Sequence, residues 1–164
     1  MTMQQTGLPV ARPADADDEA AVALARRCAE AMWARDRASQ ALGMRIEDVG
    51  PGFARMGMTV REDMVNGHDI CHGGMIFTLA DTAFAFACNA RDVATVAAGC
   101  SIEFLAPAKL GDRLTATAVE QVQSGRTGIY DVRVSDGQGA TVAVFRGKSA
   151  QLRGSVTGDP VIRA

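Results

Sequence analysis

The sequence predicts an α+β fold in which one long antiparallel sheet wraps around a single buried helix, with a further helix near the N-terminus. Three observations carry this prediction. Residues 73–88 form an almost uninterrupted apolar run of helical length. Residues 93–152 alternate between apolar and polar side chains in segments that turn residues separate. Residues 17–42 combine apolar side chains at helical spacing with acids near the start and arginines later, which is typical of an amphipathic helix.

The central helix is predicted from Gly73 to Cys88, where only Thr78, Asp81 and Thr82 interrupt the apolar residues. A surface helix carries one apolar stripe, whereas a helix that is apolar on all sides is buried. The run is too short and too interrupted to span a membrane. We therefore expect this helix to lie in the protein core, with an aspartate near its middle.

The segments before the central helix are taken in order. Residues 1–16 are polar, contain proline and lack periodicity, which predicts a disordered tail. The helix expected over 17–42 ends before Gly43, a residue typical of helix C-termini. Its inward-facing stripe is expected to consist of Val22, Ala25, Ala29, Met32 and Trp33.

Strand-like segments flank the central helix on both sides. A turn at Gly50-Pro51-Gly52 separates the first two, and Asp136-Gly137 is a hairpin signal between the last two. Residues 154–164, with two glycines and a proline, are expected to form a loose tail, so the folded domain spans 17–153. The predicted strands are 44–49, 53–60, 93–105, 112–123, 127–135 and 141–152.

The composition argues against several classes of protein. A formal charge of −2 and a pI near 5.7 give no basic surface for nucleic acid or an anionic membrane. The four cysteines show no C-x-x-C spacing and are typical of reduced thiols rather than a disulfide framework. With no recognisable signal-peptide or transmembrane run, we expect a cytoplasmic protein.

Asp81 is the first candidate functional residue. Its helical neighbours at three and four positions, Phe77, Thr78, Phe84 and Ala85, include no cation. Burying an unpaired carboxylate is costly or raises its pKa, and such a cost is more often kept for function than for stability. The alternative is that Asp81 simply faces water at the helix edge.

Gly73 and Gly74 begin the same helix, although each costs about 1 kcal/mol relative to alanine in a helix. Glycine leaves the backbone open to close approach, and the first helical N–H groups have no intrahelical partner. A helix start of this kind has the geometry of an oxyanion hole. The alternative is that the two glycines only allow tight packing against a neighbouring element.

The spacing of these two features predicts a dimer. Gly73 and Asp81 are eight residues apart, or about 12 Å along a helix axis. A reacting acyl carbon must lie within about 3–3.5 Å of its attacker and its polarising donor. One helix cannot supply both groups, whereas two antiparallel copies related by a two-fold axis can.

Several motifs together resemble a known family. An N-x5-H-G-G stretch leads into L-A-D-T-A-F-A, and C-S-I-E-F-L-x-P, T-G-I-Y-D-V and A-V-F-R-G-K-S follow. This pattern resembles the hotdog-fold acyl-CoA thioesterases, most closely the phenylacetic acid degradation (PaaI-type) branch. The resemblance implies a hotdog fold, dimers that pair into homotetramers, and hydrolysis of an aryl-acetyl-CoA such as phenylacetyl-CoA or a hydroxylated derivative.

The same resemblance assigns roles to four residues. Asp81 matches the catalytic carboxylate, acting as general base or nucleophile, and Gly73 matches the backbone N–H that polarises the thioester carbonyl. Asn66 matches the residue that holds the water or the thioester, and His72 matches a motif histidine with an orienting role. The family pattern also places a serine or threonine at the start of the next strand, where this sequence reads Val96 to Ser101 with alanines.

Other chemistries have less support from the residues. His68, Cys71 and His72 have a spacing compatible with metal ligands, but H-E-x-x-H is absent, so neither a metal nor an organic cofactor is expected. A Ser-His-Asp triad lacks G-x-S-x-G. Cys71 beside His72 is more typical of a packed cysteine than of a nucleophile. Four cations are candidates for the CoA phosphates but are typical of solvated surface: Arg113, Arg126, Arg146 and Lys148.

Two further functions stay open at this point. One is a hydratase or dehydratase on the same fold, with His72 as base. The other is a non-catalytic acyl-CoA binding module, which would usually need an effector domain for which the short tails leave no room. The small residues Ala83, Ala85 and Ala87 beside Phe84 and Phe86 permit an aryl pocket without requiring one.

Overall fold

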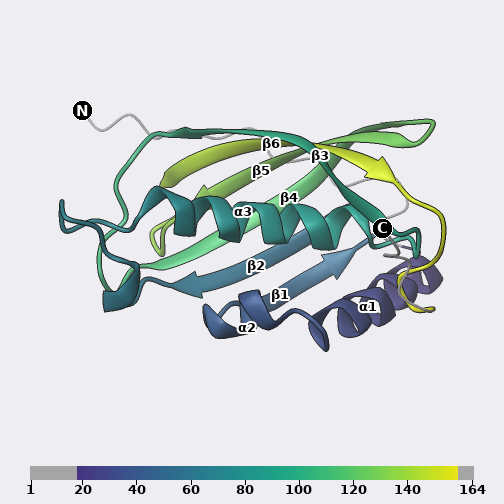
Figure 1. The fold of residues 1–164 in the computed structure, drawn as a ribbon, viewed down its shortest axis with the longest axis horizontal. Coiled ribbons are helices and arrows are strands. Elements are labelled where there is room, and N and C mark those ends of the chain that lie inside the picture. Colours follow the sequence, from purple (N-terminus) through teal and green to yellow (C-terminus); the bar gives the residue numbers. More distant parts are fainter. Residues whose placement is uncertain (1–17, 159–164) are drawn as a thin grey trace.

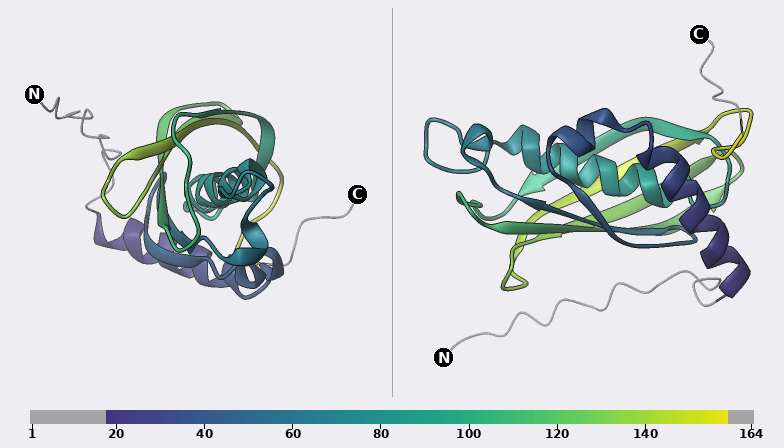
Figure 2. Two further views of the ribbon diagram at one scale, coloured as in Figure 1. Left: turned by 90° about the vertical axis from the view of Figure 1, so that its left-hand side faces the viewer. Right: turned by 90° about the horizontal axis from the view of Figure 1, so that it is seen from below.

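The computed structural model describes residues 18–158. The described chain forms a six-stranded antiparallel sheet in the order β1-β2-β4-β5-β6-β3, and the sheet curves around the helix α3 (Figures 1 and 2). The predicted arrangement of sheet and central helix is confirmed. The expected disordered tail over 1–16 lies outside the described residues. The elements are α1 (Glu19–Trp33), α2 (Arg37–Ala41), β1 (Arg45–Gly50), β2 (Phe53–Thr59), η1 (Glu62–Met64), α3 (Gly73–Cys88), β3 (Thr95–Phe104), β4 (Arg113–Ser124), β5 (Thr127–Ser135) and β6 (Thr141–Gln151).

The central helix α3 has the predicted bounds, with His72 as its N-cap and Asn89 as its C-cap. The sheet covers one side of this helix, but the other side is open in the single chain (Figure 1). Burial of the helix on all sides is therefore wrong for one chain, because a single sheet cannot enclose it. The residues that α3 buries are Ile76, Leu79, Ala80, Thr82, Ala83, Phe84, Phe86 and Ala87.

The predicted N-terminal helix is two helices. The chain turns after Trp33, and the carboxylate of Asp36 then accepts a hydrogen bond from the N–H of Ser39 and caps α2. An aspartate that caps a new helix ends the preceding one, which explains the break. Of the predicted stripe Ala25 and Ala29 are buried, whereas Val22, Met32 and Trp33 are half-buried.

The strands lie within two residues of their predicted bounds. Buried residues alternate with half-buried ones along β5 and with exposed ones along most of β6, as expected for a sheet with one face on the core. The strand β3 lies at an edge of the sheet, where it pairs only with β6, and a bulge interrupts that pairing between Ala97 and Gly99. Residues 96–101 of this strand are exposed in the single chain.

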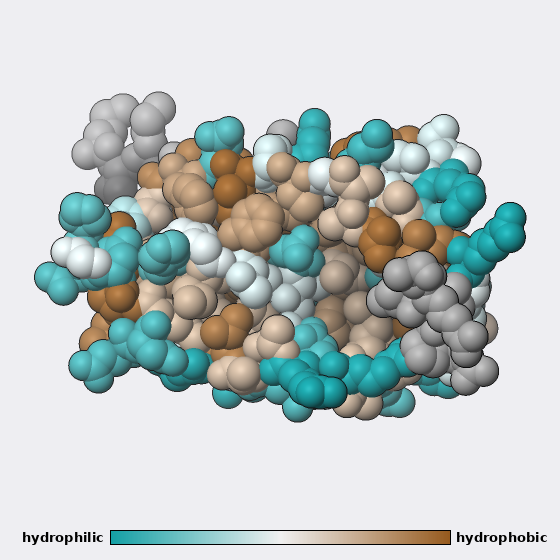
Figure 3. All heavy atoms as spheres, viewed as in Figure 1, coloured by the Kyte–Doolittle hydropathy of each residue, from teal (hydrophilic) through white to brown (hydrophobic). Residues whose placement is uncertain are grey.

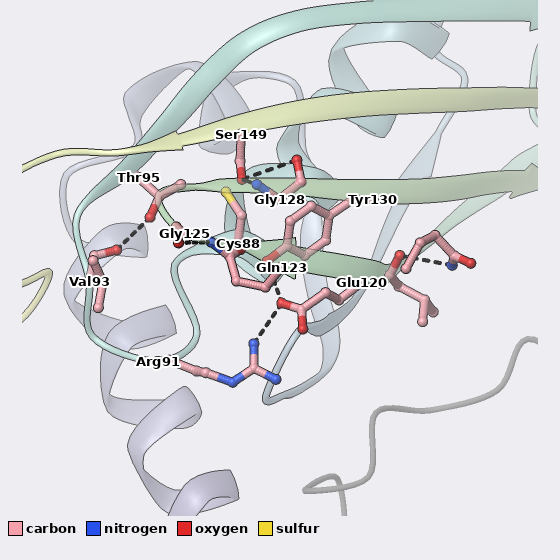
Figure 4. A network of polar contacts seen from close by, with 12 residues as sticks. Cys88, Arg91, Val93, Thr95, Glu120, Gln123, Gly125, Gly128, Tyr130 and Ser149 are labelled. Carbon is pink, nitrogen blue, oxygen red and sulfur yellow. Dashed lines mark hydrogen bonds and ion pairs between the residues drawn. The ribbon is translucent and has the colours of Figure 1, made fainter.

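A polar network anchors the sheet near the end of α3 (Figure 4). The hydroxyl of buried Tyr130 donates to Glu120 at 2.6 Å, and Arg91 pairs with the same carboxylate at 2.7 Å.

Asp92 accepts hydrogen bonds from the backbone N–H groups of Val156 and Thr157 at 2.9 Å each. Residues 154–158, expected to belong to a loose tail, are therefore held against the domain, and 159–164 lie outside the described residues.

Candidate active site

The loop before α3 fixes the side chain of Asn66. The backbone N–H of Asn66 donates to the carbonyl of Ile70, and the Oδ1 of Asn66 accepts a hydrogen bond from the N–H of His68 at 2.9 Å. This local turn is a common use of an asparagine side chain. Because Oδ1 is occupied, the amide nitrogen Nδ2 remains as a donor, and it makes no hydrogen bond with any residue that the structure describes.

His72 caps the start of α3. Its backbone is extended, and its ring Nδ1 accepts a hydrogen bond from the N–H of Gly74 at 2.9 Å. A ring nitrogen that accepts carries no proton, so the outer nitrogen Nε2 holds it in the neutral imidazole. The cap holds the first turn of the helix in place, which supports an orienting role for His72 and leaves no function for Nδ1 in proton transfer.

Gly73 presents the free donor of this helix start. The N–H of Gly74 bonds the His72 ring, and the N–H groups of Met75 and Ile76 reach the His72 carbonyl. Within residues 18–158 the N–H of Gly73 has no partner. It lies at the positive end of the α3 dipole, where an oxygen with developing negative charge is stabilised.

An apolar pocket of about 400 Å³ opens beside this donor. Asn66 and Gly73 both lie in its lining, so the two residues with free donors belong to the same pocket. The ring of Phe104 leans against the helix start: a Cβ added at Gly73 would lie 3.0 Å from Cζ of Phe104. The bare glycine backbone therefore brings an aromatic ring and a free N–H together. The other residues that line the pocket are Ile70, Cys71, Ile76, Leu105, Ala106 and Pro107.

Asp81 lies farther along α3, half-buried and outside that pocket. Burial raises the pKa of its carboxyl, and a hydrogen bond from the Cys100 thiol, at 3.9 Å from Oδ1, acts in the opposite direction. No cation pairs with Asp81 among the described residues. One chain therefore carries the free N–H of Gly73 and the carboxylate of Asp81 at separate places on α3, as the spacing of eight residues predicts.

Apolar surface surrounds these groups. In the space-filling view of the open side, brown and beige residues occupy much of the middle of the face, and hydrophilic residues border it (Figure 3). Two large side chains at the end of β3 are exposed in the single chain, Phe104 at 51% and Leu105 at 62%. Apolar exposure on this scale marks a surface that binds a ligand or another chain.

Comparison with known proteins identifies the family. The sequence profile of the thioesterase superfamily matches residues 68–143. The acyl-coenzyme A thioesterase PaaI of Escherichia coli (strain K12) is 50% identical over 131 residues, which cover 80% of this chain and 94% of that protein. The chain belongs to the thioesterase superfamily. It is a thioester hydrolase of the PaaI-like group, which confirms the resemblance of its motifs.

Solved structures of other thioesterases have the same fold as this one. The E. coli PaaI protein of the phenylacetic acid degradation operon matches with a TM-score of 0.81 and 48% identity, over 82% of this chain and 97% of that chain. A hypothetical thioesterase from Streptococcus pneumoniae TIGR4, solved with coenzyme A, matches with a TM-score of 0.65 and 25% identity, over 68% of this chain and 87% of that chain. The hotdog fold is thereby confirmed.

The structure of this thioesterase also places the residues of the alternative chemistries. In the described part of the chain no cluster of His, Cys, Asp and Glu has the geometry of a metal site. Cys71 is buried, and burial raises the pKa of its thiol, which disfavours a nucleophilic thiolate. No helix between residues 18 and 158 has the length and hydrophobicity to cross a membrane.

The candidate phosphate contacts are largely engaged within the chain. Arg113 pairs with Glu47 at 2.7 Å, Arg146 holds Asp131 through two hydrogen bonds, and Arg126 donates to the carbonyl of Gln151. Lys148 is exposed on β6. None of the three arginines is therefore preorganised for a phosphate in the single chain.

Two residues beside the candidate site were not singled out by the sequence analysis. Cys100 and Phe104 lie on the side of β3 that faces α3, and the two-residue period of C-S-I-E-F was the signal that could have found them. Phe84 and Phe86, whose small neighbours permit an aryl pocket without requiring one, pack inside the fold instead. Phe84 packs against the rings of Tyr130 and Phe145, and Phe86 lies against Trp33, all within the fold.

Proposed function

We propose that this thioesterase hydrolyses acyl-CoA thioesters to the free acid and CoA, with aryl-acetyl-CoA as the preferred class. The observation that carries the proposal is the free N–H of Gly73 beside the Nδ2 donor of Asn66 in an apolar pocket. Two free donors on residues that line one apolar space suit a thioester carbonyl. The acyl-CoA substrate is supported by the name of the E. coli relative and by the coenzyme A bound to the S. pneumoniae protein.

In this proposal the thioester oxygen accepts a hydrogen bond from the Gly73 N–H, and Asn66 holds either that oxygen or the attacking water. Asp81 acts as general base on the water or attacks the carbonyl itself. Burial raises the pKa of Asp81, which brings the carboxylate closer to the range where it accepts a proton effectively near neutral pH. Because a thiolate is a good leaving group, His72 need not act as an acid.

The aryl-acetyl preference is supported by the pocket walls and by one relative. Phe104 offers an aromatic face next to Gly73, and aromatic pairs are worth about 0.5–1.5 kcal/mol beyond the area they bury. The E. coli protein comes from a phenylacetic acid degradation operon. The cytoplasmic location, expected because the sequence has no recognisable signal-peptide or transmembrane run, stays a prediction.

The active unit in this proposal is a dimer, and two dimers form the homotetramer that the family resemblance implies. The open side of α3, the edge strand β3 and the exposed Phe104 give one continuous surface for a second copy. Two antiparallel copies of α3 would bring Asp81 of one chain to the Gly73 donor of the other. Each site would then be incomplete without its partner.

Mixing two inactive variants tests the shared site. In a mixed dimer of Asp81→Ala and Asn66→Ala chains, one site has both residues and the other has neither. Random exchange should therefore restore about a quarter of the wild-type sites. No recovery after verified subunit exchange would show that each chain carries a complete site.

The Asp81→Asn variant tests the reaction. We expect kcat for free thiol release to fall at least about 10²–10³-fold with the fold intact, whereas the control Asp92→Asn retains activity. Wild-type turnover in a folded Asp81→Asn protein would overturn the assignment of Asp81 as the catalytic carboxylate. The same assay across phenylacetyl, hydroxyphenylacetyl, benzoyl and straight-chain CoA esters tests the acyl preference. Faster straight-chain hydrolysis overturns that preference alone, and enoyl-CoA hydration in place of thiol release overturns the hydrolase.

A further inference from the structure

Cys100 is placed on the helix-facing side of β3 by its pairing with β6. Its partner across the strands is Gly147, and directly opposite residues point to the same face of a sheet. A Cβ added at Gly147 would lie 2.9 Å from the ring of Phe84 on α3, so this face looks onto the central helix. The Cys100 side chain therefore points toward α3 rather than to the outer face of the sheet.

The bulge in β3 helps to set this direction. Between Ala97 and Gly99 the pairing with β6 slips by one residue, so that Ala98 is extra. A bulge reverses which residues beyond it face the core, and bulges next to active sites commonly re-aim a side chain. In this strand the residue that the bulge brings opposite Asp81 is a thiol.

Cys100 is the one hydrogen-bond partner of the Asp81 carboxylate among the described residues. Its Sγ lies 3.9 Å from Oδ1, which leaves Oδ2 free. Thiols are weak donors, and hydrogen bonds in ligand-free active sites are often long until substrate binds. The other titratable group near this carboxylate is also a thiol, Cys88 on α3, whose pKa is raised to about 12, chiefly by burial.

The Cys100 thiol keeps its proton at neutral pH. Burial raises its pKa, and the charge of Asp81 and the hydrogen bond to it raise it further. A protonated thiol beside a carboxylate donates its S–H and does not compete as a nucleophile. In this pair the Cys100 thiol is therefore the hydrogen-bond donor and the Asp81 carboxylate is the acceptor.

We propose that Cys100 is a positioning residue for Asp81, whose Oδ1 it holds by an S–H hydrogen bond so that Oδ2 faces the water or the thioester. The inference rests on the proposed role of Asp81. A donor to Oδ1 fixes the rotation of the carboxylate and stabilises its charged form. The thiol contacts neither substrate nor water and acts only through Asp81.

Three variants test the proposal. Cys100→Ala removes the donor, Cys100→Ser keeps one, and Cys28→Ala is the matched control, because Cys28 lies 3.9 Å from Oδ1 of Asp92 away from the pocket. In Cys100→Ala we expect kcat to fall about 2- to 10-fold with KM unchanged. The acid limb of the pH–rate profile should move to higher pH, since the carboxylate loses a bond that favours its charge. Cys100→Ser should return the limb toward the wild type, and Cys28→Ala should leave both kcat and the limb unchanged.

Carbon-13 NMR titration of the Asp81 carboxyl separates this inference from the proposed function. A higher Asp81 pKa in Cys100→Ala than in the wild type supports the contact without reference to activity. If Asp81→Asn is inactive but Cys100→Ala keeps the wild-type acid limb and the wild-type Asp81 titration, the positioning role is overturned. If Asp81→Asn is fully active, the proposed catalytic role of Asp81 falls, and an unchanged titration in Cys100→Ala would overturn the contact as well.

Discussion

At the start of α3 the side-chain amide of Asn66 and the N–H of Gly73 belong to residues that line a pocket, and these donors have no partner among the described residues. At the end of α3 the same kinds of groups are hydrogen-bonded inside the fold. Asn66 leaves its Nδ2 free, but Asn89 uses its whole amide: it donates to the carbonyls of Ala85 and Thr95 and accepts from the N–H of Thr95, each at 2.9 Å. Asp81 has one weak thiol donor, whereas Asp92 accepts from two backbone N–H groups and from the hydroxyl of Thr157.

This difference separates residues that stabilise the fold from residues that remain available to a ligand. Asn66, Gly73 and Asp81 are half-buried in the single chain, and no fully buried side-chain N or O atom of the described residues lacks a partner. A ligand or second chain that covers the three residues must supply partners for them, because a buried polar group without a partner costs about 1–3 kcal/mol. The end of α3 carries no such cost, because the Tyr130–Glu120–Arg91 network and Asn89 close it (Figure 4). The free donors of Asn66 and Gly73 and the weakly bonded carboxylate of Asp81 therefore mark the candidate site.

The largest effect is expected from removing the free donor itself. Gly73→Pro deletes the N–H, yet proline is favoured at the first helical position, and the extended backbone of His72 suits a residue before proline. We expect kcat for thiol release to fall about 10²–10³-fold, as for loss of an oxyanion donor. Circular dichroism and thermal unfolding should show a folded protein.

Gly73→Ala is the matched control for this prediction. It adds the same Cβ near Phe104 but keeps the N–H, so its loss of kcat should be much smaller. Because the nearest atoms are the far edge of an aromatic side chain, the ring can give way. Equal losses in the alanine and proline variants would show that space against Phe104 matters at Gly73, and not the hydrogen bond.

The two asparagines should dissociate stability from activity. Asn89→Ala leaves the buried N–H and carbonyl of Thr95 without their side-chain partners, which should lower the free energy of unfolding by about 2–4 kcal/mol. In the protein that remains folded, kcat should be unchanged. Asn66→Ala should lower kcat with little change in the urea midpoint. A loss of activity in folded Asn89→Ala protein would contradict the division between the two ends.

The sequence was sufficient where local chemistry decides the structure. An apolar run such as Gly73 to Cys88 is expected to pack against the inner face of a sheet, and the helix has the predicted bounds. Alternation located the strands, because one face of the sheet is buried. The distance between Gly73 and Asp81 follows from the rise of a helix alone, and the structure keeps both groups apart within one chain.

Features that depend on distant partners could not be predicted in this way. The helix break at Asp36 looks like one more charged residue on a helix surface until its carboxylate is seen to cap Ser39. The period of two groups Cys100 with Phe104 on one side of β3, but only the bulge and the pairing with β6 show that this side faces α3 and Asp81. Phe84 resembled a pocket residue until the sheet supplied Tyr130 and Phe145 against it.

The smallest effect, and the sharpest test of the comparison, is the sign of two aspartate substitutions on stability. Burial raises the pKa of Asp81, so its charge opposes folding, and Asp81→Asn should raise the melting temperature at pH 7. Burial also acts to raise the pKa of Asp92, but hydrogen bonds from Thr157 and Val156 outweigh it and lower the pKa. Asp92→Asn should therefore lower the melting temperature. The corresponding changes in the free energy of unfolding should both stay within about 1 kcal/mol.

The pH dependence of these shifts follows from the direction of each pKa. A raised pKa means that the stability from Asp81 is present at low pH and is lost as the pH rises through its folded-state value, so the gain in Asp81→Asn should disappear on acidification. A lowered pKa means that the stability from Asp92 is present near neutrality and is lost as the pH falls through its folded-state value. Melting curves of both variants and the wild type, recorded at one protein concentration between neutral and acidic pH, should therefore converge from opposite sides. If both substitutions changed the melting temperature at pH 7 in the same direction, the surroundings of Asp81 would stabilise its charge as those of Asp92 do. The contrast between the two carboxylates would then be wrong.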